Sequence, residues 1–303
     1  MTEPRGDACL NCGAPLVGHF CGECGQRDIP PYPGVRELTL DAISELSGWD
    51  GRFSSTVRTL VRRPGMLTRE FLEGRRARYT SPVRLYLSAS VAYFLLAAAA
   101  PNVRIGDTVT GVNVSATTTG SAPEDSRASR VGSVATAALE SGEALSETER
   151  AATLAEIERA PPVMRPFLRR VVLDPGGFRR GIVETMPRML FVLLPLFAGI
   201  VALFYRGRKY PEHLYFAIHL HTFLFLALGV TALMRFTQVP ALVAMAGLVA
   251  AIWIPIYAIL AYRRVYGDSL GRTLAKGAAI GAIYAVTSAV AFTVMIYWVS
   301  VAG

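Results

Sequence analysis

The chain has 303 residues, of which 52% are hydrophobic and 18% are charged, and its mean hydropathy is +0.36. This composition excludes an ordinary soluble domain and indicates an integral membrane protein. The 31 basic and 23 acidic residues leave a formal charge of +8, and the basic residues lie beside apolar segments. That distribution predicts contact with anionic lipid head groups and argues against nucleic-acid binding.

The first predicted element, at residues 1–28, is a small metal-binding ribbon. Cys9 and Cys12 form one pair of cysteines, Cys21 and Cys24 form a second, and glycine follows each pair. Such a turn directs two thiolates to one side, and two turns supply the four tetrahedral ligands that zinc prefers. We therefore expect one structural zinc ion, with iron or a redox-active dithiol as alternatives and His19 as a substitute ligand. A closed site of four thiolates leaves no position for a reacting water, so catalysis at this metal is not expected.

Residues 29–82 are predicted to form a basic amphipathic region next to the membrane. Phe53, Val57, Leu60 and Val61 recur at helical spacing among arginines, and Pro64-Gly65 ends the pattern. This pattern favours a helix on the membrane surface, and a helical hairpin packed on the ribbon is the alternative. Five arginines form the predicted basic patch for lipid head groups: Arg69, Arg75, Arg76, Arg78 and Arg84.

Five apolar stretches have the length of about 20 residues that crosses a bilayer. They lie at 83–100, 189–205, 214–234, 240–262 and 277–298. The predicted fold class is thus mostly α, a polytopic α-helical membrane protein with about five transmembrane helices and a small N-terminal zinc ribbon. The first span occupies 83–100 and is the least secure, because it is short and begins beside Arg84; the other four lie within 186–303.

Charges in the loops predict the orientation of these spans. Residues 206–209 form a short basic loop, and the loop before the fifth span carries Arg263, Arg264, Arg272 and Lys276. Basic loops favour the cytoplasmic side, which places the N-terminus inside if there are five spans and outside if there are four. Because the clustered cysteines indicate a reducing compartment, we expect five spans in a bacterial inner (cytoplasmic) membrane, with the C-terminus extracytoplasmic.

Residues 101–185 are predicted to be an extracytoplasmic loop that is partly disordered, because its first half has few large apolar groups. Ser146 and Glu149 have the spacing of a capping box, which predicts a helix near 147–160. A second helix is predicted near 163–173, where apolar residues alternate with arginines, and we expect it at the membrane interface.

The third span begins with four ionisable residues: Glu212, His213, His219 and His221. Ionisable groups at membrane depth are costly, which suggests a transport pathway or a ligand site. However, His219 and His221 point to nearly opposite faces of one helix, so this helix alone cannot build a metal site. The alternative is structural: Glu212 and His213 cap the helix entrance while the later histidines bond to neighbouring helices. In the fifth span, Gly277 and Gly281 offer a close-packing face for a homo-oligomer.

Three segments carry a family resemblance: CLNCGAPLVGHFCGECGQ, GRFSSTVRTLVRRPGMLTREFLEGRRARYTSPVRLYLSAS and MPRMLFVLLPLFAGIVALFYRGRKYPEHLYFAIHLHTFLFL. Together they resemble the bacterial membrane family called domain of unknown function 3667. The resemblance implies a zinc ribbon joined to a membrane domain, and it implies no established activity.

Three functions are compatible with these features. The first is a non-enzymatic scaffold or regulator that binds a protein partner at the ribbon and anionic lipid through the basic region. The second is a transporter or channel component that uses the polar residues of the third span. The third is a membrane-embedded enzyme acting on a lipid-like substrate, which lacks any catalytic constellation in the sequence.

Overall fold

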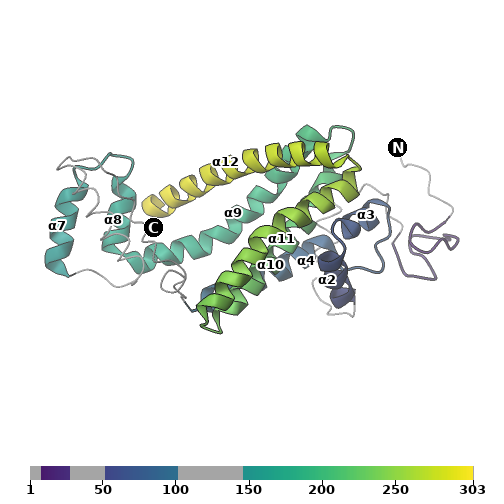
Figure 1. The fold of residues 1–303 in the computed structure, drawn as a ribbon, viewed down its shortest axis with the longest axis horizontal. Helices are drawn as coiled ribbons and strands as arrows, with labels where there is room; N and C mark the ends of the chain where they lie inside the picture. Colours follow the sequence, from purple (N-terminus) through teal and green to yellow (C-terminus); the bar gives the residue numbers. More distant parts are fainter. Residues whose placement is uncertain (1–7, 28–51, 102–145, 303) are drawn as a thin grey trace. The chain divides into compact units, whose positions relative to one another are not determined.

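The computed structural model describes residues 8–27, 52–101 and 146–302, and the regular elements of these ranges are helices (Figure 1). The helices are α2 Arg52–Arg62, α3 Met66–Leu72, α4 Pro82–Ala99, α7 Glu147–Ile157, α8 Arg165–Leu173, α9 Pro175–Phe204, α10 Tyr210–Arg235, α11 Pro240–Tyr266 and α12 Leu270–Ala302. No strand occurs in the described ranges, where only two isolated β-bridges are found, both in the ribbon. The predicted helical fold class is therefore confirmed.

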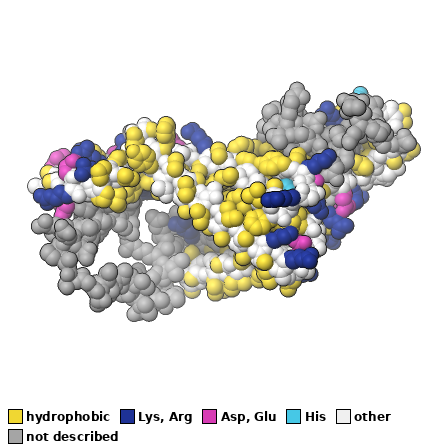
Figure 2. Space-filling model, turned by 90° about the horizontal axis from the view of Figure 1, so that it is seen from above, with side chains coloured by type: hydrophobic (Ala, Val, Ile, Leu, Met, Phe, Trp, Pro, Cys, Tyr) yellow, Lys and Arg dark blue, Asp and Glu magenta, His cyan; other side chains and the backbone are white. Residues whose placement is uncertain are grey.

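Five of these helices are long and apolar enough to cross a membrane, namely α4, α9, α10, α11 and α12. They contain 18 to 33 residues, and a rise of about 1.5 Å per residue makes even the shortest about as long as the hydrocarbon layer is thick. The least secure of the predicted spans, α4, is among them, with both Pro82 and Arg84 in its first turn. Hydrophobic side chains cover much of the helical surface in the view of Figure 2, as expected for a surface that faces lipid.

Helix α9 is longer than its apolar stretch. It begins at Pro175, well before residue 189, and carries exposed Arg179, Arg180 and Glu184 in its first turns. Hydropathy marks where a helix can enter lipid, whereas the helix itself continues as long as its backbone hydrogen bonds do.

The chain divides into two compact units. The first contains residues 1–111 and 194–283, and the second contains residues 112–193 and 284–303. In the first unit, α10 packs against both α4 and α11. Half of its apolar window is buried, more than in the other four spans, so α10 is the central helix of this unit. Phe225 of α10 lies 5.6 Å from Tyr86 and 5.5 Å from Tyr93 of α4, measured between ring centroids.

The α2–α3 hairpin packs on the membrane helices. Tyr257 of α11 donates its hydroxyl to the Leu60 carbonyl at 2.7 Å, and Arg264 donates to the Pro64 carbonyl at 2.6 Å. Gly65 has φ 72°, and its backbone lies against that of Ala261. The apolar side of α2 therefore meets α11 at Leu60, while Val61 remains 39% exposed. The two helices form a hairpin, which was the alternative to a helix on the membrane surface, but this hairpin packs on α10 and α11, whereas the alternative placed it on the ribbon.

The second unit has a small core of its own. Side chains from α7, α8, α9 and α12 form it: Ile157, Leu168, Val171, Val172, Phe178 and Val299. The apolar side of α8, expected at the membrane interface, is buried in this core because α7 and α9 cover it. Helix α7 starts after Ser146 as predicted, but the capping box does not form. The Ser146 hydroxyl instead donates to the Glu149 carboxylate at 2.5 Å.

Candidate metal centre and its surroundings

The four cysteines of the ribbon converge on one point. Their sulfur atoms all lie within 4.8 Å of one another, and the Cys9–Cys24 and Cys12–Cys21 pairs are 3.6 and 3.5 Å apart. A tetrahedron of sulfurs with metal–sulfur bonds of about 2.3 Å has edges of about 3.8 Å. The four thiols are free, and within the described ranges they are the only group of this kind that could hold a metal ion.

Each cysteine pair is held by its own backbone turn, and the two turns are of the same kind. Gly13 donates its N–H to the Cys9 carbonyl at 2.8 Å, and Gly25 donates to the Cys21 carbonyl at 2.9 Å. The two glycines have φ of 76° and 69°, a left-handed conformation that glycine adopts without strain. Two short local turns, each closed by a glycine, therefore position all four sulfur atoms, which explains why the cysteine spacing alone predicted that they converge.

The electrostatics of the cluster favour a bound cation. Backbone amides of Cys24 and Glu23 lower the pKa of the Cys21 thiol to about 7. The Ala14 amide also acts to lower the pKa of Cys12, but the neighbouring sulfurs outweigh it and raise that pKa to about 12. Four adjacent thiolates repel one another, and a metal ion removes this repulsion. His19 is exposed and is not a member of the cluster.

The ribbon rests on the loop that follows α3. Gln26 donates its side-chain N–H to the Gly74 carbonyl at 2.8 Å. Its side-chain oxygen accepts the N–H groups of Arg76 and Ala77 at 3.0 and 3.1 Å. Leu10 covers Gly74 closely enough that a Cβ atom at Gly74 would lie 2.7 Å from the Leu10 Cδ1. Sequence reasoning missed Gln26 because an amide side chain carries no signal of its partner.

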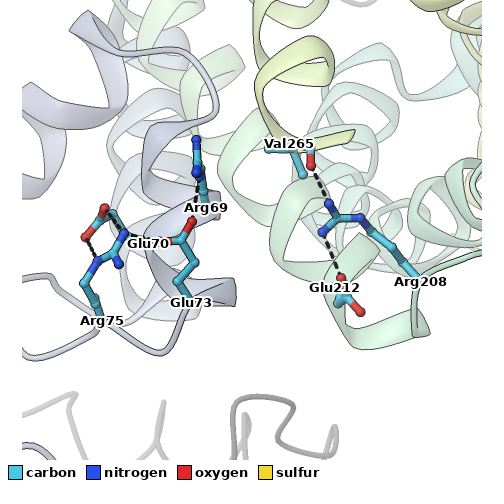
Figure 3. A network of polar contacts seen from close by, with 7 residues as sticks. All are labelled: Arg69, Glu70, Glu73, Arg75, Arg208, Glu212 and Val265. Carbon is cyan, nitrogen blue, oxygen red and sulfur yellow. Dashed lines mark hydrogen bonds and ion pairs between the residues drawn. The ribbon is translucent and has the colours of Figure 1, made fainter. Parts of the chain in front are cut away.

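Several arginines of the predicted basic patch bond to other groups of the protein (Figure 3). Arg75 pairs with Glu70 at 2.7 Å and also with Glu73, while Arg69 pairs with Glu73 at 2.6 Å. The Arg69 guanidinium lowers the pKa of Glu73. The positive charge near α3 is therefore partly neutralised by acidic neighbours.

The remaining arginines of the patch differ in their surroundings. Arg76 donates to the Phe71 carbonyl and lies over the Tyr215 ring, 5.7 Å from its centroid. Arg78 is exposed and Arg84 is half-buried. A role in binding lipid head groups stays a prediction for all five.

Glu212 closes the start of α10. Its carboxylate accepts the backbone N–H of Lys209 at 3.1 Å and pairs with Arg208 at 3.0 Å. Arg208 also donates to the Val265 carbonyl at the end of α11, at 2.7 Å (Figure 3). The carboxylate thus caps α10 and the bound arginine ties α10 to α11, as the structural alternative for Glu212 requires.

His213 lies in an aromatic cluster next to this cap. Its Nδ1 shares a hydrogen bond of 2.8 Å with the Tyr266 hydroxyl. Tyr205 stacks on Tyr266 with 3.9 Å between ring centroids, and the Lys276 ammonium lies 4.2 Å from the Tyr205 centroid. Lys276 also pairs with Asp268 at 2.7 Å. The cations of this cluster are therefore balanced by nearby carboxylates.

The two later histidines have separate surroundings. His219 shares a 3.0 Å hydrogen bond with the Thr68 hydroxyl of α3, and its other ring nitrogen has no partner among the described residues. It lines a cavity of about 10 Å³, which is the size of one water molecule. His221 bonds to the Ala217 carbonyl of its own helix and packs against Phe197. The four polar residues of the third span thus each contact a different set of neighbours.

Glu212→Gln should lower the stability of the first unit. The neutral amide keeps the size of the side chain but loses the ion pair with Arg208, which costs about 1–3 kcal/mol for a buried group. The thermal unfolding midpoint in detergent, followed by intrinsic fluorescence, should therefore decrease. Glu184→Gln is the matched control, because Glu184 is exposed on α9. Equal midpoints for the two variants would contradict the assigned role of Glu212.

Comparison with known proteins identifies one segment of the chain. No curated protein and no solved structure matches the chain significantly. The family resemblance predicted from the sequence is confirmed over α2, α3 and most of α4, because residues 50–94 match the family described as "Protein of unknown function (DUF3667)".

Proposed function

We propose that this chain is a non-enzymatic protein of a bacterial inner membrane, whose cytoplasmic ribbon holds one structural zinc ion and binds a protein partner. The protein acts as a scaffold or regulator on the cytoplasmic face. The observation that carries this proposal is a four-cysteine ribbon that is docked on the loop after α3 and yet exposes large apolar side chains.

The ligand set supports zinc in a structural role. Zinc accepts four thiolates in a tetrahedron without a preference for another geometry, and the sulfur spacing matches its bond lengths. All four positions are taken by protein ligands, so none remains for a substrate or a reacting water. Metal analysis of the purified protein separates zinc from iron.

The contacts at the ribbon end support a cytoplasmic N-terminus. Arg264, which the structure places in the last turn of α11 and not in the following loop, bonds to the α2–α3 turn. Arg208, in the loop between α9 and α10, bonds to the end of α11. Both basic segments therefore lie at the same end of the first unit as α2 and α3. Positive charge favours the cytoplasmic side, and five spans then direct the C-terminus outward.

The exposed surface of the ribbon supports a protein partner. Val17 is 96% exposed and Phe20 is 63% exposed, beside a hollow of about 400 Å³ that is lined by both side chains and by Pro15 and Glu23. Apolar anchors that enter such hollows dominate protein interfaces. Glu23 disfavours an anionic lipid surface here, and it favours a protein segment that presents an apolar side chain beside a basic one.

A photo-crosslinking experiment in cells tests the partner. A photoreactive phenylalanine analogue at position 17 should give a discrete adduct with another protein. The adduct should disappear in Phe20→Ser, which retains all four cysteines and should bind zinc as the parent does. The same analogue at Arg78, exposed but outside the ribbon, is the control.

The size of the adduct decides between the possible occupants of the hollow. A product of one defined mass, whose identified partner gives the reciprocal crosslink, supports the proposal. Adducts with lipid only, a product of two copies of this chain, or no adduct at all would each contradict it. Transport through the third span and an enzyme acting on lipid stay predictions, because no contact in the described part of the chain favours either.

A further inference from the structure

Gln26 connects the metal turn to the rest of the first unit. The backbone carbonyl of Gln26 accepts the N–H of Cys21 at 2.8 Å, which makes this residue part of the second cysteine turn. Its side chain, in contrast, makes the three hydrogen bonds to the Gly74–Ala77 loop. The backbone of Gln26 therefore closes the second cysteine turn, while its side chain binds the Gly74–Ala77 loop.

The first cysteine turn reaches the same loop through Leu10. This residue lies between Cys9 and Cys12, and its side chain covers Gly74. Gly74 has φ 79°, so the loop has a conformation that most other residues adopt only with strain. Both halves of the metal centre thus hold the loop, and their relative position depends on the metal that joins them.

The loop in turn is bonded to the central membrane helix. Arg76 donates to the Phe71 carbonyl of α3 and lies over the Tyr215 ring of α10. Phe71 lies 5.8 Å from Tyr215 and 5.4 Å from His219, between ring centroids. Thr68 bonds to His219 at 3.0 Å. A continuous series of contacts therefore runs from the cysteine turns through α3 to α10.

We infer that the metal state of the ribbon is coupled to the conformation of the Gly74–Ala77 loop, and through this loop to the packing of α3 on α10, with Gln26 as the positioning residue. This inference rests on the proposed structural metal. With metal bound, the two cysteine turns are fixed relative to each other, and both Leu10 and Gln26 contact the Gly74–Ala77 loop. Without metal the two turns separate, the N–H groups of Arg76 and Ala77 lose their acceptor, and the loop loosens. By reciprocity, the docked loop strengthens metal binding.

Hydrogen exchange on the full-length protein in detergent tests the coupling. Removal of metal by a chelator should increase exchange in residues 73–79 by about 10-fold or more, which is the change expected when a stable hydrogen bond opens. Gln26→Ala removes the side-chain bonds but keeps the backbone carbonyl that closes the cysteine turn. It should retain bound zinc, exchange rapidly in this loop with or without metal, and bind zinc about 5-fold more weakly. Arg58→Ala, exposed on α2 and outside both the ribbon and this loop, should behave as the parent.

The outcomes separate this inference from the proposed function. If the parent binds no stoichiometric metal, the structural zinc itself is refuted. If the parent binds metal but residues 73–79 exchange equally with and without it, only the coupling is refuted. Protection of the loop in Gln26→Ala equal to that of the parent would also overturn it, whatever the metal content.

Discussion

Cys12→Ser should remove the metal and unfold the ribbon. Structural zinc contributes about 10–16 kcal/mol to the folding of modules of this size, and the ribbon has few buried side chains to replace that contribution. Among its cysteines only Cys9 and Cys21 are fully buried. Bound zinc, measured by metal analysis of the purified protein, should fall to background, and residues 8–27 should become sensitive to protease.

His19→Ala is the matched control for this prediction. His19 is exposed and lies between the two cysteine pairs, but it is not in the four-cysteine cluster. The variant should therefore bind as much zinc as the parent. Zinc bound normally by Cys12→Ser but lost in His19→Ala would contradict the ligand assignment and favour the histidine as a ligand.

Gly65→Ala should dislodge the α2–α3 hairpin from α11. Its φ of 72° is strained for alanine, and the added Cβ would lie 2.8 Å from the Ala261 carbonyl oxygen and 3.0 Å from its Cα. Both neighbours are helix backbone and cannot rotate away. The left-handed conformation and the overpacking together cost about 2–5 kcal/mol. We expect a lower unfolding midpoint in detergent and faster cleavage of residues 52–72 by protease.

Gly207→Ala provides the comparison for Gly65→Ala. Gly207 lies in the turn between α9 and α10, and no atom lies within 4 Å of the position its Cβ would occupy. This variant should match the parent in both assays. If Gly65→Ala is as stable as Gly207→Ala, the hairpin does not lie against α11 as described.

The candidate metal centre shows how much a local pattern can predict. Each cysteine pair and its glycine form a turn of five residues, and the bonds from Gly13 to Cys9 and from Gly25 to Cys21 lie within that turn. The convergence of the four sulfur atoms therefore followed from the spacing of the cysteines. The surface on which the ribbon rests could not be predicted from the cysteine spacing, because Gln26 and Gly74 are bonded to each other although they lie 48 residues apart in the chain.

For the polar residues of the third span, the sequence predicted the direction of the side chains but not their partners. Their sequence positions showed that His219 and His221 point in different directions, which the structure bears out with Thr68 on one side and Phe197 on the other. The partners themselves could not be named, since Thr68 had no distinguishing signal. Likewise, Tyr266 was not recognised as the partner of His213, although the tyrosines near the end of α11 were visible in the sequence.

Sequence alone was sufficient for the cluster of four cysteines, for the five helices that are long and apolar enough to cross a membrane, and for the break at Pro64-Gly65. Each of these depends on residues close together in the chain, either through turn geometry or through the apolar length that a bilayer requires. Only the tertiary structure decided which surface the hairpin covers. An amphipathic pattern records that one side of a helix is buried, but Leu60 with Tyr257 and Pro64 with Arg264 meet across about 200 residues of chain, a distance over which no local pattern carries information.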